Sequence, residues 1–532
     1  MAGFTITRRT ALGTALGAAT FAARPAWSQQ AAATVDEAAV DMVVQRFMAA
    51  FDTPGIAVAI VRKGRPAWVR GYGVRTLGRA AKVDEHTRFG IASNTKAFTA
   101  ALLAQLVDAG KVEWDAPVVR YLPEFRMADA AVTQMMTVRD LLVHRSGLPL
   151  GAGDLMIFPK SDRPAADIMK ALPELKPARG FRAGYDYDNI LYIVAGLLIE
   201  RVSGQPFQRM MQDRLLTPLG MTDAVPSLVL LKGDNVAGRH ARLGPPVRGM
   251  GAMKVVPPDE APNIDAAGGI NASASDVAKW LEVQLASGAL PDGKRLWSEA
   301  QAREMWTPQT IVRFGNGPTS ENPAAPVTAT YALGWFAQDY RGERLVSHSG
   351  GLSGQVTQTA MLPARSAGVV VLSNVEDGVS SGIRNALLDM LIGAPAFDWV
   401  AAWQKRTAQQ DKEALETLGA TATAAPAGGP SLPLKAYAGR YRDRWYGDIV
   451  VSEKRGKLYI DFLPTPVFKS VLEPWGPDTF RTRFAAEAGE DALVTFATAG
   501  AAVTGVTMKA FSPLADFSYD FHDLAFTPVL PR

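Results

Sequence analysis

A serine and a lysine three residues apart, Ser93 and Lys96, are the first groups in this chain whose types and spacing could perform chemistry. They form the only Ser-x-x-Lys sequence in the 532 residues and follow a strand-like segment, Thr87 to Ile91. A helix is expected over Ser93 to Ala109, which places Lys96 one turn from Ser93 on the same face. At a helix start, free N–H groups and the positive dipole end stabilise negative charge. Such a serine could attack a carbonyl carbon while the lysine helps to remove its proton.

A tyrosine and an asparagine, Tyr187 and Asn189, form a second candidate pair, between Gly184 and an apolar helix that begins at Ile190. A phenol beside Lys96 could have its pKa lowered by the positive charge and act as a general base. The amide of Asn189 could bond both a substrate carbonyl and the lysine. The alternative is a core tyrosine followed by an asparagine that caps the helix.

A glycine-rich sequence, His348-Ser349-Gly350-Gly351, follows an expected strand over residues 344–347. A strand edge with two glycines lets a substrate backbone lie alongside without side-chain obstruction, and its N–H groups can stabilise an oxyanion. The alternative is a glycine-rich turn that happens to contain a histidine.

Each motif alone has a structural explanation, and on the order of one Ser-x-x-Lys is expected by chance in a chain of this length. Together and in this order, over roughly residues 35–395, they resemble serine β-lactamases, penicillin-binding DD-peptidases and their esterase and peptidase relatives, especially the class C branch. Four further stretches support the resemblance: Thr137 to Pro149, Pro218 to Met221, Gly268-Gly269 and Tyr331 to Trp335.

The resemblance implies a role for each candidate. Ser93 would be the acylated nucleophile and Lys96 its electrostatic and proton-relay partner. Tyr187 would be the base in acylation and would activate water in deacylation, while Asn189 would position the substrate amide. The backbone N–H groups of Ser93 and Gly351 would form the oxyanion hole. No metal or organic cofactor is implied.

His348 departs from the family pattern, which more often has lysine in a Lys-Thr-Gly sequence. Lysine is a permanent cation that recognises a carboxylate, whereas histidine is mostly neutral at pH 7. Within the family, histidine here resembles D-aminopeptidase-like and DD-carboxypeptidase-like members. The resemblance therefore implies peptide amide cleavage through a Ser93 acyl-enzyme. A carboxylesterase or β-lactamase on the same fold is an alternative, and a non-catalytic peptide- or peptidoglycan-binding protein is an alternative of another class.

The elements that must position these residues indicate an α/β fold. Hydrophobic runs over residues 55–61 and 66–70 flank Lys63-Gly64 and predict a hairpin. Further strands are expected at 345–347 and 368–373, on the far side of a helix-rich middle. This order predicts one sheet with helices on both faces. The resemblance implies a β-lactamase/transpeptidase-like three-layer sandwich: an antiparallel sheet flanked by helices, plus a helical subdomain.

The chain divides after about residue 395. We expect the serine hydrolase domain over residues 29–395, a helix and an Ala/Thr/Pro/Gly linker over 396–433, and a small all-β barrel over 434–532. The last segment, which begins near Leu434 to Tyr441, resembles the lipocalin-like domain appended to some peptidases of this group. In such relatives the extra domain contributes to the cleft or to assembly.

The N-terminus indicates export. Arg8-Arg9, an apolar run from Ala11 to Ala23 and the small residues Ala26 and Ser28 are typical of a twin-arginine signal over residues 1–28. We therefore expect a periplasmic or secreted protein without a stable membrane span, since the apolar stretch that begins at Ile190 is short enough for a core helix.

Composition and sequence patterns argue against several other classes. Removing the three arginines of the signal lowers the formal net charge from +4 to +1, which argues against a nucleic-acid partner. The chain has no cysteine and five scattered histidines, which argues against zinc and thiol chemistry. A Gly-x-Ser-x-Gly sequence surrounds Ser380 and could mark the nucleophile of an α/β-hydrolase, in which an acid and then a histidine follow the serine in the chain. The only histidine after Ser380 is His522, deep in the C-terminal β segment, so we interpret the sequence as a loop. The expected partner is a small peptide or ester substrate, and a homo-oligomer is compatible with the sequence.

Overall fold

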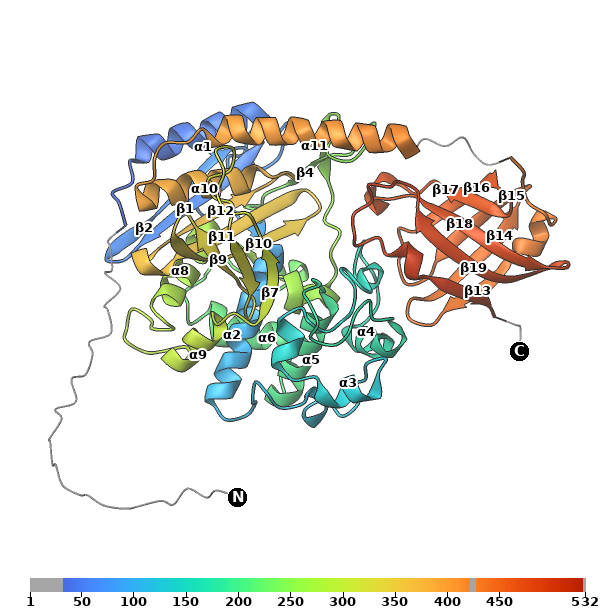
Figure 1. Cartoon of the computed structure of the whole chain (residues 1–532), viewed down its shortest axis with the longest axis horizontal. Coiled ribbons are helices and arrows are strands. Elements are labelled where there is room, and N and C mark those ends of the chain that lie inside the picture. Colours follow the sequence, from blue (N-terminus) through green and yellow to red (C-terminus); the bar gives the residue numbers. More distant parts are fainter. Residues whose placement is uncertain (1–31, 422–426, 530–532) are drawn as a thin grey trace, which may run out of the picture.

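The structure is a computed structural model that describes residues 32–421 and 427–529 (Figure 1). The expected export signal at residues 1–28 lies outside the described residues. Within these ranges no single helix is long and apolar enough to cross a membrane. Helix α5 (Ile190–Ser203) and the segment Phe207–Leu216 meet that criterion only together, across a bend of 80°.

One antiparallel sheet forms the centre of the first domain, in the order β2-β1-β12-β11-β10-β9-β8-β7. At the centre of the sheet, β1 from the start of the domain sequence pairs with β12 from its end, in a register that sets Ile56 opposite Ser373. The strands are β1 (Gly55–Arg62), β2 (Arg65–Gly73), β7 (Thr310–Phe314), β8 (Thr328–Tyr331), β9 (Phe336–Tyr340), β10 (Glu343–Leu352), β11 (Gln355–Leu362) and β12 (Ala367–Ser373). Two short pairs lie outside the sheet: β3 (Phe89–Gly90) with β6 (Asn271–Ala272), and β4 (Arg239–Arg242) with β5 (Met253–Val256).

Helices cover both faces of this sheet, as Figure 1 shows. Alternate residues of β1 are buried in two different clusters: Ile56 and Val58 pack with α1, α10 and α11, whereas Ala57 and Ala59 pack with α8 and the helical subdomain. A strand with two covered faces is hydrophobic throughout, which explains the continuous apolar run of β1. The predicted three-layer fold is confirmed. The helices are α1 (Glu37–Phe51), α2 (Thr95–Asp108), α3 (Ala130–Met135), α4 (Ala165–Ala171), α5 (Ile190–Ser203), α6 (Phe207–Met211), α7 (Asp265–Gly268), α8 (Ala274–Leu285), α9 (Glu299–Met305), α10 (Val379–Ile392) and α11 (Trp399–Thr421).

The C-terminal segment forms a closed barrel of antiparallel strands, in sequence order from β13 to β20. Aromatic side chains, among them Tyr446, Phe462 and Phe526, fill its interior and contact one another edge to face. The predicted small all-β barrel is therefore confirmed. Its strands are β13 (Gly439–Asp443), β14 (Gly447–Lys454), β15 (Lys457–Phe462), β16 (Lys469–Gly476), β17 (Thr479–Thr482), β18 (Ala492–Ala499), β19 (Ala502–Ala510) and β20 (Ala525–Pro528).

Candidate active site

Ser93 lies in a 3₁₀ turn, Ala92–Asn94, that connects the short strand β3 to α2. The helix thus begins two residues later than the sequence predicts, at Thr95. Ala92 adopts a left-handed backbone conformation with φ of 50°, which costs energy for a residue with a Cβ atom and turns the chain sharply before the serine. Ala92 and Asn94 are buried, whereas Ser93 is partly exposed. The turn therefore presents the serine toward solvent.

Asn94 ties this turn to the central sheet. Its Nδ2 donates to the Ile91 carbonyl at 3.1 Å and to Thr357 Oγ1 at 2.9 Å. Its Oδ1 accepts a hydrogen bond from Thr359 Oγ1 at 2.7 Å. Because both threonines belong to β11, the position of the serine is set by the sheet and not by α2 alone.

Lys96 is fully buried, and its ammonium group makes three hydrogen bonds. Nζ donates to Ser93 Oγ at 3.0 Å, to Asn189 Oδ1 at 2.8 Å and to the Ala267 carbonyl at 3.0 Å. Burial lowers the pKa of Lys96 to about 7, although the nearby carboxylates of Asp154 and Asp188 act in the opposite direction. The lysine can therefore exist near neutral pH in a form that accepts the serine proton.

Tyr187 completes this group, with its ring centroid 4.8 Å from Lys96 Nζ. Its pKa is raised above the ordinary value, not lowered as the sequence led us to expect. Burial is the largest cause, and it outweighs a hydrogen bond with Ser93 that acts in the other direction. The phenol therefore stays protonated at neutral pH, and Lys96 is the group of the three that changes protonation there. A protonated phenol that shares a hydrogen bond with the serine can still relay a proton.

Asn189 is buried and held from both sides. Its Oδ1 accepts from Lys96, and its Nδ2 donates to both carboxylate oxygens of Asp154 at 3.2 Å. A carboxylate can only accept from the amide and an ammonium can only donate to it, so these partners fix which way the amide points. Asp154 was not identified from the sequence, because no local motif surrounds it.

His348 and the glycines lie on β10, next to the turn that carries Ser93. β10 pairs with β9 only as far as Ser347, so among the described residues the following segment has strand β11 on one edge alone. A Cβ atom at Gly350 would lie 2.9 Å from Cβ of Ala92, so only glycine allows the strand to approach this closely. Ser349 and Gly351 are exposed. The free edge beside Ser93 is where a substrate backbone could pair.

His348 is buried and neutral. Burial is the first cause that lowers its pKa to about 3, and the nearby Lys96 is the second. Its Nδ1 is 2.6 Å from the Ser349 carbonyl, which can only accept, so Nδ1 carries the proton. Nε2 then accepts from the hydroxyl of Tyr331 at 2.9 Å. Tyr331 belongs to a stretch that supported the family resemblance, but its contact with His348 could not be read from spacing.

His144, expected in a structural turn, lies beneath the tyrosine. It has φ of 53°, and its ring centroid is 4.2 Å from that of Tyr187. Its Nδ1 accepts from the N–H of Asp188 at 3.2 Å, which supports the segment bearing Tyr187 and Asn189.

Ser380, the central residue of the Gly-x-Ser-x-Gly sequence, does not lie in the candidate site. Ser380 is fully buried near the start of α10, and its hydroxyl has no hydrogen-bond partner within the described ranges, so it faces no cleft. Across these same ranges, no group of three histidine or acidic side chains is arranged to hold a metal ion.

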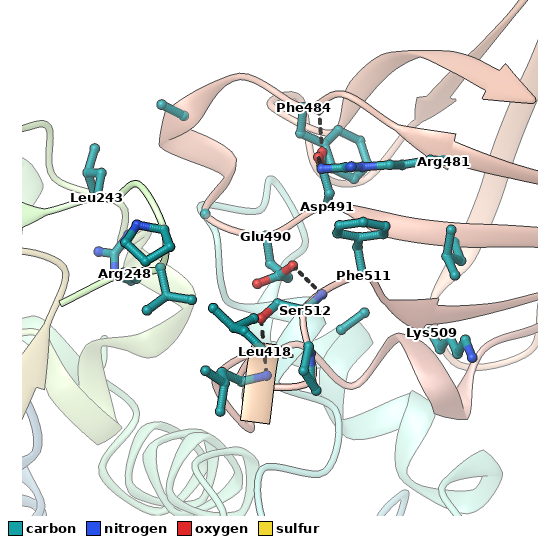
Figure 2. A pocket seen from close by; sticks show the side chains of 18 of the residues that line it. Leu243, Arg248, Leu418, Arg481, Phe484, Glu490, Asp491, Lys509, Phe511 and Ser512 are labelled. Carbon is teal, nitrogen blue, oxygen red and sulfur yellow. Dashed lines mark hydrogen bonds and ion pairs between the residues drawn. The ribbon is translucent and has the colours of Figure 1, made fainter. Parts of the chain in front are cut away.

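A cavity of about 1000 Å³ lies between the first domain and the barrel (Figure 2). Leu243 and Arg248 border it on one side, opposite Glu490, Phe511 and Ser512 of the barrel. Its lining includes none of the candidate site residues. Arg248 nevertheless links the cavity to the turn that follows β10, because its guanidinium donates to Ser353 Oγ at 3.0 Å, two residues beyond Gly351.

This fold, with a serine, a lysine and a tyrosine gathered beside a glycine-bearing strand edge, defines a serine hydrolase of the β-lactamase and penicillin-binding protein type. A family model described as Beta-lactamase matches residues 40–394, about two thirds of the chain, and the chain belongs to that family. A second model, described as a domain of unknown function (DUF3471), matches residues 423–528 and covers the barrel.

One sequence relative and two solved structures illustrate the similarity. The unguisins hydrolase ungD of Aspergillus violaceofuscus is 32% identical over 442 residues, which cover 76% of this chain and 75% of the relative. The octameric penicillin-binding protein homologue from Pyrococcus abyssi is 21% identical with a TM-score of 0.59, and covers 92% of this chain and all of that one. The D-amino acid amidase from Ochrobactrum anthropi is 22% identical with a TM-score of 0.54, and covers 66% and 97%. The two solved structures show the same fold.

Proposed function

We propose that this chain is an exported serine hydrolase that cleaves amide bonds of peptides through an acyl-enzyme on Ser93. The observation that carries the proposal is the 3.0 Å hydrogen bond between Lys96 Nζ and Ser93 Oγ, with the lysine pKa near 7. A lysine with a pKa near 7 is partly neutral at pH 7, so it can accept the proton of the serine hydroxyl at that pH.

In the proposed reaction, Ser93 Oγ attacks the amide carbonyl while its proton passes to Lys96, directly or through the phenol of Tyr187. The N–H groups of Ser93 and Gly351 stabilise the oxyanion of the tetrahedral intermediate. When the intermediate collapses, the C–N bond breaks and the leaving amine takes the proton. Water then attacks the acyl-enzyme and gives its proton to the same relay. The ester C–O bond breaks, the relay returns the proton to Ser93 Oγ, and the acid is released.

The state of His348 favours peptides over β-lactams. The family pattern more often places a permanent cation here, which would pair with a substrate carboxylate. Burial lowers the pKa of His348 to about 3, so the imidazole is neutral at pH 7, and its Nε2 accepts a hydrogen bond from Tyr331. An amide backbone that pairs with the free edge of β10 needs no such cation. That the Ochrobactrum relative is named as an amidase is consistent with this choice.

Two serine variants form a matched test. Wild-type protein should react covalently with a fluorophosphonate probe and hydrolyse members of a panel of D- and L-peptides, p-nitrophenyl esters and a chromogenic cephalosporin. Ser93→Ala should lose labelling and hydrolysis. Ser380→Ala removes a buried hydroxyl without a described partner and should keep both.

The same panel separates the alternatives. A higher kcat/KM on esters or on the cephalosporin than on any peptide would replace the peptidase by an esterase or a β-lactamase. Folded wild-type protein that takes no label would favour the non-catalytic binding protein.

A further inference from the structure

A loop of the barrel contacts the domain that carries the candidate site. This loop, residues 511–524 between β19 and β20, meets residues 149–156 of the first domain. Asp520 accepts hydrogen bonds from the N–H groups of Gly153 at 2.7 Å and Leu155 at 3.2 Å. Ser518 Oγ donates to Asp154 Oδ2 at 3.0 Å. Phe517 packs so closely on Gly151 that a Cβ atom there would lie 2.5 Å from its ring.

The segment held by this loop supports two of the candidate residues. The N–H of Gly151 donates to the carbonyl of Tyr187 at 2.9 Å. The carboxylate of Asp154 accepts from Asn189 Nδ2, whose Oδ1 binds Lys96. Tyr187 and Asn189 therefore both rest on a segment whose other side is covered by the barrel.

The contacts join into one continuous chain of hydrogen bonds, from Ser518 through Asp154, Asn189 and Lys96 to Ser93. With Asp154 ionised and Lys96 protonated, the direction of each hydrogen bond is fixed. The Ser518 hydroxyl and the Asn189 amide both donate to Asp154, and the Lys96 ammonium donates to the Asn189 oxygen and to Ser93. Removing the Ser518 hydroxyl takes one of the hydrogen bonds from the buried Asp154 carboxylate and leaves only those from Asn189. In low-dielectric surroundings the loss of such a bond is costly.

We propose that Ser518 and Asp154 are positioning residues: the barrel, through Ser518, holds Asp154 so that Asn189 places Lys96 against Ser93. The C-terminal domain is thus an integral part of the catalytic centre and not an appendage. The inference rests on the proposed function of Ser93 and Lys96, and it assigns residues that no motif of the chain identifies.

The same hydrogen bonds also connect the protonation of Asp154 to that of Lys96. Burial raises the pKa of Asp154 to about 7, and the hydrogen bonds from Asn189 and Ser518 act against this rise. Without the Ser518 hydroxyl, Asp154 holds its proton more firmly and gives less support to the ammonium of Lys96. The pKa of Lys96 then falls further. The other titratable groups that face these two are Asp188, Asp520, Tyr187, Tyr192, His144 and His348.

The test compares full-length variants by their rate of fluorophosphonate labelling between pH 5 and 9. Ser518→Ala should lower the maximal rate about tenfold, and Asp154→Asn about 100-fold. Both should move the acid midpoint of the profile to lower pH. Ser518→Thr keeps a hydroxyl at this position and should show the wild-type pH profile. The control is Ser512→Ala in the same loop. Within the described residues the Ser512 hydroxyl accepts only from the N–H of Leu514, so its removal should change neither the maximal labelling rate nor the acid midpoint.

The outcomes separate the inference from the function on which it rests. If Ser518→Ala labels as fast as wild type, or slows without a shift of the midpoint, the positioning role is wrong. If wild-type protein takes no label, the proposed function itself fails. Thermal unfolding of each variant identifies one that does not fold. Should Asp154→Asn be unfolded, the Ser518→Ala and Ser518→Thr pair decides alone.

Discussion

Replacing Gly350 with alanine should push β10 away from the turn that carries Ser93. The added Cβ atom would lie 2.9 Å from Cβ of Ala92, 2.7 Å from Thr357 Oγ1 and closer still to the carbonyl oxygen of Ile91. Carbon atoms in contact prefer a separation of about 3.5–4.0 Å. A backbone oxygen cannot rotate away, so strand and turn must separate by about 1 Å.

This displacement falls on the two N–H groups proposed to stabilise the oxyanion, those of Ser93 and Gly351. A misplacement of about 1 Å can cost about 100-fold in rate, and the loss of one oxyanion donor costs a similar factor. We therefore expect Gly350→Ala to lower kcat/KM about 100-fold, or about 2.7 kcal/mol of transition-state stabilisation. Overpacking should also destabilise the fold, by about 1–3 kcal/mol.

Gly351→Ala is the matched control, because it makes the same chemical change one residue away. A Cβ atom at residue 351 would meet no atom of the described residues within 4 Å, and the backbone N–H is retained. The assay is kcat/KM for the best substrate of the panel, with thermal unfolding to show that both variants are folded at the assay temperature. The loss at 350 should exceed the loss at 351 by at least about tenfold. Equal losses, or full activity in Gly350→Ala, would refute the close packing of strand and turn as the basis of the site.

Three further predictions follow from buried charges. The fluorophosphonate labelling rate should rise as pH increases through about 7, because only deprotonated Lys96 can accept the serine proton, and Lys96→Arg should abolish labelling across this range. Burial is the largest single influence on the pKa of Asp140 and raises it, but the hydrogen bonds from Arg182, Thr137 and Arg145 together lower it below the ordinary value. Ionised Asp140 therefore stabilises the fold above the unfolded pKa, and this contribution is lost as pH falls through the folded pKa. Asp140→Asn should thus lower Tm at pH 7 and flatten its fall below about pH 4. Arg239→Ala leaves the buried carboxylate of Glu260 without its cation and should cost about 3–5 kcal/mol in denaturant unfolding, whereas replacing both residues with apolar ones should restore most of that loss.

Local spacing was sufficient to predict the parts of the fold and site that depend on neighbouring residues. The three-residue interval between Ser93 and Lys96 correctly placed the two side chains together. The alternating pattern around Lys457 to Phe462 correctly indicated barrel strands. In both cases the period of the element determines which way a side chain points.

Burial and long-range contact were not accessible from spacing. The pKa of Tyr187 goes in the opposite direction from the one expected, because the nearby lysine was visible in the sequence and the surrounding apolar mass was not. The 3₁₀ turn before α2 depends on the left-handed conformation of Ala92, and an alanine gives no signal for it. Asp154 and Ser518 meet across 364 residues of sequence, and neither lies in a recognisable motif.

The pairing of β1 with β12 has a consequence for the order in which the protein matures. Ile56 finds its partner only when Ser373 has been made, and the loop that carries Ser518 is made later still. Contacts so distant in the chain form slowly and cannot form during most of translation. A nascent polypeptide that has not reached residue 518 therefore contains the candidate nucleophile Ser93 without the loop proposed to support it, so hydrolytic activity should require this later segment.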